Sequence, residues 1–177
     1  MKIEAVFIDR DGTLGGTGHF IHPKDFSIYP FTLKALQILK NNDIKIYACT
    51  NQHRISKGEA TIQDFKREFQ LLGFDDAFIC PHSMDSNCLC KKPQTGMLLE
   101  ASQKYNIDLK KSVFIGDVGA TDMLAAHNVG AIKILVCTGW GRSSLDEYRD
   151  SWKHVNADYI AENLLEAVQW VISKYNV

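Results

Sequence analysis

The sequence contains no apolar run of the roughly 18 to 20 residues that a membrane-spanning helix needs. An export signal is also missing, because the apolar run at residues 3–8 is short, has charges at both edges and precedes no small-residue cleavage site. These absences predict a cytoplasmic protein with no membrane partner. Disulfide bonds are rare in that compartment, so the five cysteines need another explanation.

Charge of one sign is not in excess either. The 20 Lys and Arg residues nearly balance the 21 Asp and Glu residues, which gives a formal net charge of -1. The bulk charge provides no attraction to nucleic acid, and we expect no nucleic-acid partner. Repeats, low-complexity tracts and linker-like stretches are absent too. The sequence therefore predicts one domain over residues 1–177. We favour a monomer over an oligomer, although no sequence feature determines the oligomeric state.

Apolar runs of strand length alternate with segments that have helical spacing. The predicted strands are residues 3–8, 44–49, 77–80, 112–116, 131–137 and 157–160. The predicted helices are a segment after Pro30 that carries Leu33, Leu36, Ile38 and Leu39, and residues 61–72, 95–106, 120–129 and 162–175. This alternation predicts an α/β protein with a three-layer, doubly wound and mostly parallel sheet. An active site is expected beyond the carboxyl ends of the strands.

Two acidic residues follow the first predicted strand. Asp9 and Asp11 are two positions apart, so both side chains would face one way in a continued strand. Like charges this close are costly unless a cation compensates them. Magnesium, which takes carboxylates, water and a substrate phosphate, would do so. The alternative is an ordinary Asp-Gly turn with a solvated acid before it.

Other polar residues follow the later strands. Thr50 and Asn51 end the second strand and offer a hydroxyl and an amide that suit phosphate oxygens. Lys92 precedes a predicted helix, where its ammonium group could neutralise a phosphoryl group. Asp117 and Asp122 follow the fourth strand and could complete a metal site. Each signal is weak alone, but together they stand in a specific order.

In the order of these residues along the chain, the sequence resembles the haloacid dehalogenase superfamily, which has a Rossmann-like fold. Its four motifs correspond to DRDGT (9–13), TNQ (50–52), KP (92–93) and GDVGATD (116–122). The resemblance implies a phosphatase that acts on a small soluble phosphate ester. It implies Asp9 as the nucleophile that becomes phosphorylated, and Asp11 as the general acid and base. It further implies Mg²⁺ held by Asp9, Asp11, Asp117 and Asp122, with Thr50, Asn51 and Lys92 around the phosphate.

Three cysteines and a histidine lie within eleven residues. Cys80, His82, Cys88 and Cys90 could close a tetrahedral shell around Zn²⁺. Four protein ligands leave no open position, so the zinc would be structural and would fix a small loop just before Lys92. Reduced thiols or a labile disulfide are the alternative.

The pattern C-x-H…C-x-C-[KR]-K-P resembles one branch of the superfamily. That branch contains the heptose 1,7-bisphosphate phosphatases and the histidinol-phosphate phosphatases, which lack a large cap domain. We expect the former type of sugar-phosphate substrate, with histidinol phosphate as the alternative. Short loops at residues 14–26 and 51–58, together with the zinc loop, would then shape the pocket. Arg54 and Lys91 are predicted to bind a second anionic group of the substrate.

Three other functions remain open at this stage. A receiver domain also combines paired acids, a Thr and a Lys, but its phosphate-accepting Asp follows the third strand. A zinc-stabilised binding protein with a degraded site would not need the complete set of acids. A phosphotransferase of the same superfamily would use a sugar hydroxyl in place of water.

Overall fold

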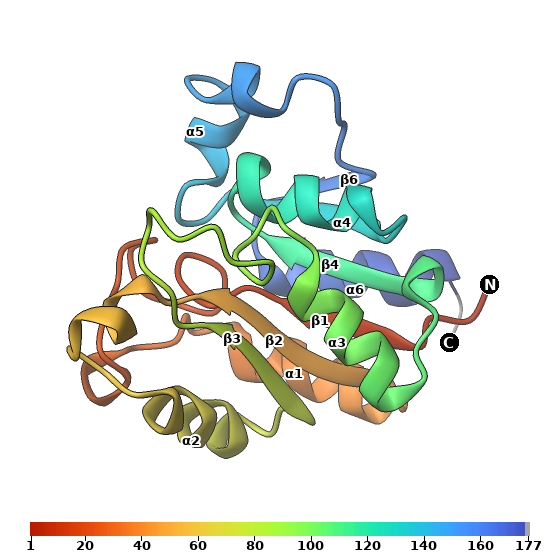
Figure 1. Ribbon diagram of the computed structural model, residues 1–177. Coiled ribbons are helices and arrows are strands. Elements are labelled where there is room, and N and C mark those ends of the chain that lie inside the picture. The colour runs from red at the N-terminus through yellow and green to blue at the C-terminus, as the bar shows by residue number, and fades with distance from the viewer. Residues whose placement is uncertain (176–177) are drawn as a thin grey trace.

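The computed structural model describes residues 1–175. Six strands form one sheet in the order β3-β2-β1-β4-β5-β6, and every neighbouring pair is parallel (Figure 1). The strands are β1 (Ala5–Ile8), β2 (Lys45–Asn51), β3 (Asp76–Cys80), β4 (Ser112–Gly116), β5 (Ile132–Val136) and β6 (Tyr159–Ala161). This order reverses direction between β1 and β4, and ligands of such sheets bind at that point.

The central strand β1 is apolar on both faces. Val6 and Ile8 pack into one hydrophobic cluster, and Ala5 and Phe7 pack into another on the opposite face. All four residues are fully buried. A strand that is covered on both sides reads as a continuous apolar run, which is why the sequence identifies it directly.

Helices cover both faces of the sheet. The helices are α1 (Thr32–Asn41), α2 (Ile62–Leu72), α3 (Gly96–Tyr105), α4 (Leu124–Asn128), α5 (Gly141–Leu145) and α6 (Leu164–Tyr175). Buried residues of α1, α2 and α6 belong to the cluster on one face, and those of α3 and α4 belong to the cluster on the other (Figure 1). The predicted three-layer α/β architecture is thus confirmed.

Two segments differ from the sequence-based expectation. The predicted helix 120–129 begins as a π-helical turn at Gly119–Met123 and continues as the short helix α4. The stretch from 139 to 156, which lies outside all the predicted elements, contains α5 and a turn of 3₁₀ helix at Arg149–Trp152. Trp152 is buried against Gly119 and donates its indole N–H to the Ser144 carbonyl at 2.8 Å.

No large cap domain is inserted between the elements of residues 1–175. Within the same residues, no helix combines the length and the apolar character that a bilayer crossing requires. The edge of the sheet at the carboxyl ends of the strands is therefore bordered by connecting segments and not by a second domain.

Candidate active site

The residues that end neighbouring strands meet at one edge of the sheet. Asp9 follows β1, Asn51 ends β2 and Asp117 follows β4. The backbone N–H of Asp9 donates to the carbonyl of Ile115 at 3.0 Å, so the ladder between β1 and β4 extends to the first acid. The parallel register thus brings together residues that lie far apart in the sequence.

Gly12 lets the chain turn sharply behind the two N-terminal acids. Its φ of +87° is a conformation that glycine adopts without strain. A Cβ at this position would lie 2.1 Å from Oδ2 of Asp117 and 2.9 Å from Cα of Gly139. The Thr138 hydroxyl donates to the Gly12 carbonyl at 2.6 Å. The absence of a side chain therefore allows the loops after β1, β4 and β5 to converge.

Lys92 lies at the centre of the acids. Its Nζ donates to Oδ1 of Asp9 at 2.8 Å, to Oδ1 of Asp122 at 2.6 Å and to the Cys49 carbonyl at 2.8 Å. Burial by itself would lower the pKa of Lys92, but the carboxylates of Asp122 and Asp9 outweigh it and raise that pKa. The lysine is therefore a fixed positive charge beside Asp9.

Three carboxylates surround this single ammonium group. Asp9, Asp117 and Asp122 each offer an oxygen, and these oxygens all lie within 4.8 Å of one another. Burial, and then the negative charges of Asp9 and Asp122, raise the pKa of Asp117 well above its ordinary value. One lysine cannot balance three buried carboxylates, and oxygen ligands at this separation suit a hard divalent cation such as Mg²⁺. The residues present therefore fit the expected metal.

Asp11 lies beside this cluster and is held at both oxygens. Gln52 donates its Nε2 to Oδ2 at 2.6 Å, and Arg10 donates its Nη1 to Oδ1 at 2.7 Å. Burial raises the pKa of Asp11 to about 6, although the positive charge of Arg10 opposes that shift. A carboxyl group with such a pKa can exchange protons near neutral pH, as a general acid and base must.

The residues around a cleft of about 160 Å³ define the site. They are Asp9, Asp11, Gly18, Phe20, Asn51, Gln52, His53, Lys92, Val118, Thr121 and Asp122. The predicted loops 14–26 and 51–58 contribute to this lining, as does the predicted metal ligand Asp122. Val118 and Thr121, in the same turn after β4, were not predicted as site residues. The zinc loop before Lys91 contributes none of these described lining residues.

Comparison with known proteins agrees with this geometry. Residues 89–167 match the HAD-hydrolase-like family model. The D-glycero-D-manno-heptose-1,7-bisphosphate 7-phosphatase of Thermosynechococcus vestitus is 33% identical, over 97% of this chain and 96% of that protein. The D-glycero-beta-D-manno-heptose-1,7-bisphosphate 7-phosphatase of Helicobacter pylori strain 26695 is 33% identical, over 71% of this chain and 78% of that protein.

The chain belongs to the haloacid dehalogenase-like phosphatases. Among solved structures, the D,D-heptose 1,7-bisphosphate phosphatase from B. bronchiseptica, complexed with magnesium and phosphate, superimposes with a TM-score of 0.83. It is 26% identical, and the alignment covers 97% of this chain and 99% of that one. The expected superfamily, the fold and the phosphatase activity are thus confirmed.

In this phosphatase, the polar residues after β2 mainly hold other site residues. The Asn51 side chain accepts from the backbone N–H of Lys92 at 2.9 Å and donates to the Lys92 carbonyl at 3.1 Å. Thr50 is buried, and its hydroxyl oxygen accepts from Nε2 of Gln52 at 2.9 Å. Asn51 reaches the cleft, whereas Thr50 is absent from the described lining residues, so its predicted phosphate contact stays a prediction.

Arg54 and Lys91 are not among the described lining residues of the cleft, so their predicted contact with a second anionic group of the substrate stays a prediction. Nη1 of Arg54 lies 3.0 Å from both carboxylate oxygens of Glu59. The Lys91 ammonium donates to the backbone carbonyls of Ser83 and Ser86, at 3.3 and 3.1 Å, and to that of Met84. Both cations have local partners in the structure, and Lys91 closes the zinc loop on itself.

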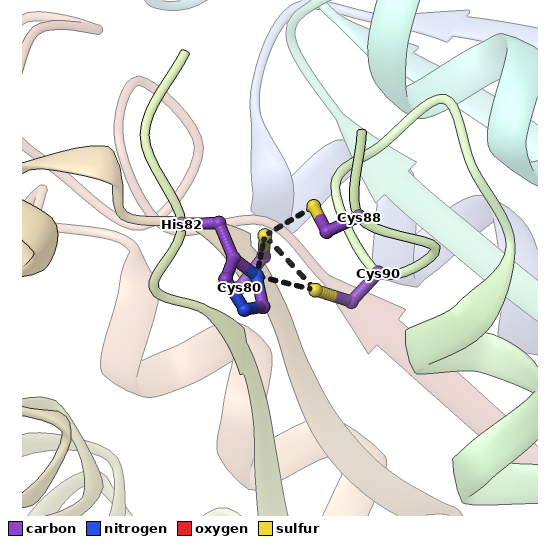
Figure 2. Close-up of side chains that lie close together, drawn as sticks. All are labelled: Cys80, His82, Cys88 and Cys90. Atoms are coloured by element: carbon purple, nitrogen blue, oxygen red, sulfur yellow. Dashed lines mark hydrogen bonds between the residues drawn. The ribbon is translucent and has the colours of Figure 1, made fainter. Parts of the chain in front are cut away.

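The four predicted zinc ligands of the phosphatase do converge. Figure 2 shows Cys80 and His82, at the end of β3, pointing toward the two thiols of the loop. Sγ of Cys90 lies 3.1 Å from Sγ of Cys80 and 3.1 Å from Nδ1 of His82, and Sγ of Cys88 lies 3.6 Å from that of Cys80. All five cysteines are free thiols. Tetrahedral zinc–thiolate bonds of about 2.3 Å separate sulfurs by about 3.8 Å, so the cluster is compatible with a zinc ion.

Gln52 and Trp140, which hold predicted acids of the site, were not predicted from the sequence. Gln52 was quoted only as part of a motif, yet its amide holds Asp11. The backbone N–H of Trp140 donates to Oδ2 of Asp117 at 2.8 Å, and none of the four sequence motifs includes Trp140. Backbone donors carry no residue-type signal, which is why Trp140 could not be recognised.

Proposed function

We propose that this phosphatase hydrolyses its substrate through a phosphorylated Asp9. The observation that supports this most is the Asp9–Lys92 pair, with its N–O distance of 2.8 Å at the floor of the cleft. The ammonium group donates a hydrogen bond to Oδ1 of Asp9, whereas Oδ2 accepts no hydrogen bond from any donor among residues 1–175. An oxygen in this position can attack a phosphorus atom that enters the cleft.

Asp11 supplies and removes the proton in this proposal. As Oδ2 of Asp9 forms its bond to phosphorus, the bond from phosphorus to the ester oxygen breaks, and Asp11 protonates that oxygen. Asp11 then takes a proton from a water molecule that attacks the same phosphorus. The Asp9–phosphorus bond breaks, and inorganic phosphate and the free carboxylate of Asp9 result.

Asp9 and Asp117, with the backbone carbonyl of Asp11, would hold Mg²⁺. The bound ion supplies charge compensation for the phosphoryl group and for the carboxylates. Asp122 accepts from Lys92 at one oxygen and from the Val118 N–H, at 3.0 Å, at the other. We therefore propose that the main role of Asp122 is to orient the Lys92 side chain. Support of the metal's water shell is its secondary role. A structural Zn²⁺ on the four converging ligands would fix the chain just before Lys92.

The substrate that we propose is a sugar phosphate of the heptose 1,7-bisphosphate type. Its support is the activity in the names of the relatives from T. vestitus and H. pylori, which match most of the chain. Hydrolysis of histidinol phosphate remains the alternative, because the five-residue gap between His82 and Cys88 resembles that branch.

A substrate panel tests the proposal. The purified protein is assayed with heptose 1,7-bisphosphate, histidinol phosphate and other sugar phosphates, with and without Mg²⁺, by release of inorganic phosphate. We expect turnover only with Mg²⁺ and the highest kcat/KM for the heptose ester. Asp9→Asn should lose turnover while its circular dichroism spectrum is unchanged. Near-normal turnover by that variant would refute the nucleophile assignment.

A further inference from the structure

Arg10 is a buried charge that the proposed reaction leaves without a role. It stands between Asp9 and Asp11 in the sequence, and its side chain is 0% exposed. Arginine is almost never fully buried unless it is paired, because desolvation of a charge is costly. The partners of this guanidinium group therefore indicate what it is for.

Glu68, a residue of α2, binds the edge of the guanidinium group that carries Nε and Nη2. Nε of Arg10 donates to Oε2 at 2.6 Å, and Nη2 donates to Oε1 at 2.9 Å. A two-point contact of this kind fixes both the position and the plane of the group. The carboxylate is itself only 11% exposed, so water competes little for it.

Two aromatic rings restrict the same guanidinium group. Its Cζ lies 3.7 Å from the ring centroid of Phe26 and 4.9 Å from that of Phe65. With Nε and Nη2 held by Glu68, the remaining nitrogen, Nη1, points at Asp11 and donates to Oδ1 at 2.7 Å. The orientation of Asp11 is thus coupled to a residue of α2 that does not touch the phosphoryl site.

We propose that Glu68 and Arg10 are positioning residues that hold the Asp11 carboxyl group at the angle required for proton transfer. Arg10 fixes one oxygen and Gln52 fixes the other, so rotation of the carboxyl plane is blocked. Proton transfer is efficient only when the acid lies within hydrogen-bond reach of the departing oxygen. This inference rests on the proposed role of Asp11 as the general acid.

A comparison of leaving groups tests the proposal. Glu68→Gln keeps the side-chain size but replaces one acceptor oxygen with a donor, and Arg10→Lys removes the two-point contact. A p-nitrophenolate ion leaves without a proton, whereas an alkoxide needs one. For both variants we expect kcat/KM for an alkyl phosphate to fall about 10- to 100-fold, and that for p-nitrophenyl phosphate to fall less than about 3-fold.

Two controls separate positioning from loss of stability. Phe69→Leu truncates a buried residue of the same helix whose ring packs on Phe74, whereas the rings that lie over the Arg10 guanidinium group are Phe26 and Phe65. This variant should lower the thermal midpoint and should change kcat/KM by the same factor for both esters. Asp11→Asn should show the same leaving-group dependence as Glu68→Gln, only larger.

The outcomes are distinct. The positioning role would be overturned if kcat/KM fell equally for both esters in Glu68→Gln and Arg10→Lys, or if it fell for neither ester. The leaving-group dependence of Asp11→Asn would then still support the general-acid role of Asp11. If Asp11→Asn itself showed no leaving-group dependence, the general-acid role would fail, and the positioning role with it.

Discussion

At the scale of single residues, the Lys92 ammonium group shows how the site is balanced. It has three N–H bonds, and each has an acceptor: two carboxylates and one backbone carbonyl. Its charge offsets only part of the surrounding negative charge. The site therefore favours a further cation.

Gly12 provides a residue-scale prediction with a matched control. Gly12→Ala would combine a positive φ with a contact of 2.1 Å to Asp117, whereas Gly58→Ala has a φ of +71° and no heavy atom within 4 Å. Gly58→Ala should lower the free energy of unfolding by about 1–2 kcal/mol through backbone strain alone. Gly12→Ala should lower the free energy of unfolding at least twice as much as Gly58→Ala does, and it should abolish turnover. Urea unfolding and a phosphatase assay check both, and equal losses in stability would contradict the argument.

Which site residues the sequence could identify depends on how they act. Asp9 and Asp117 follow strands and Lys92 precedes a helix; all three act through their charges, and their order along the chain already predicted that they meet. Gln52 and Arg10 act through the neighbours that they orient, and those neighbours are set by the packing of α2 and β2. Such partners, 58 positions apart for Arg10 and Glu68, cannot be read from local spacing.

At the scale of elements, the segment between β3 and α3 is held from two sides. The Cys/His cluster ties it to the end of β3, and the Asn51 amide ties Lys92 to the end of β2. The position of the lysine thus depends on two strands that are neighbours in the sheet.

Loss of the proposed zinc ion should therefore lower both the stability and the turnover. We expect Cys90→Ser to contain less than one zinc per chain, measured by elemental analysis. If its stability falls by about 3 kcal/mol, the thermal midpoint should fall by about 6–12 °C, and turnover should fall at saturating Mg²⁺. Cys137→Ser, a free thiol outside the cluster, is the control and should keep its metal. A zinc-free wild-type protein would refute the assignment.

The elements themselves were largely predictable, and the exceptions have a physical cause. Buried parallel strands are continuous apolar runs, and amphipathic helices such as α6 repeat their apolar residues at helical spacing. The region of α5 has neither pattern. It is held by individual contacts, such as the hydrogen bond from the Trp152 indole to the Ser144 carbonyl. Such contacts produce no periodic pattern in the sequence.

At the scale of the whole molecule, the buried acids couple metal binding to folding. A cation that binds only the folded state stabilises it by about 2.7 kcal/mol at a concentration 100 times its dissociation constant. We expect Mg²⁺ to raise the thermal midpoint of the wild-type protein. Asp117→Asn removes one buried negative charge, so its metal-free form should melt above the wild type and should respond little to Mg²⁺. Calorimetry with and without Mg²⁺ checks both, and a full magnesium response in the variant would contradict the metal assignment.

The strand order also has a consequence for synthesis. Strand β1 leaves the ribosome first, but it lies between β2 and β4, and β4 begins only at residue 112. Until then the most apolar strand keeps one open edge, which can pair with other chains. A nascent or truncated product that ends before β4 should therefore aggregate, and Asp9, the proposed nucleophile, meets its partner Asp117 only after β4 has been made.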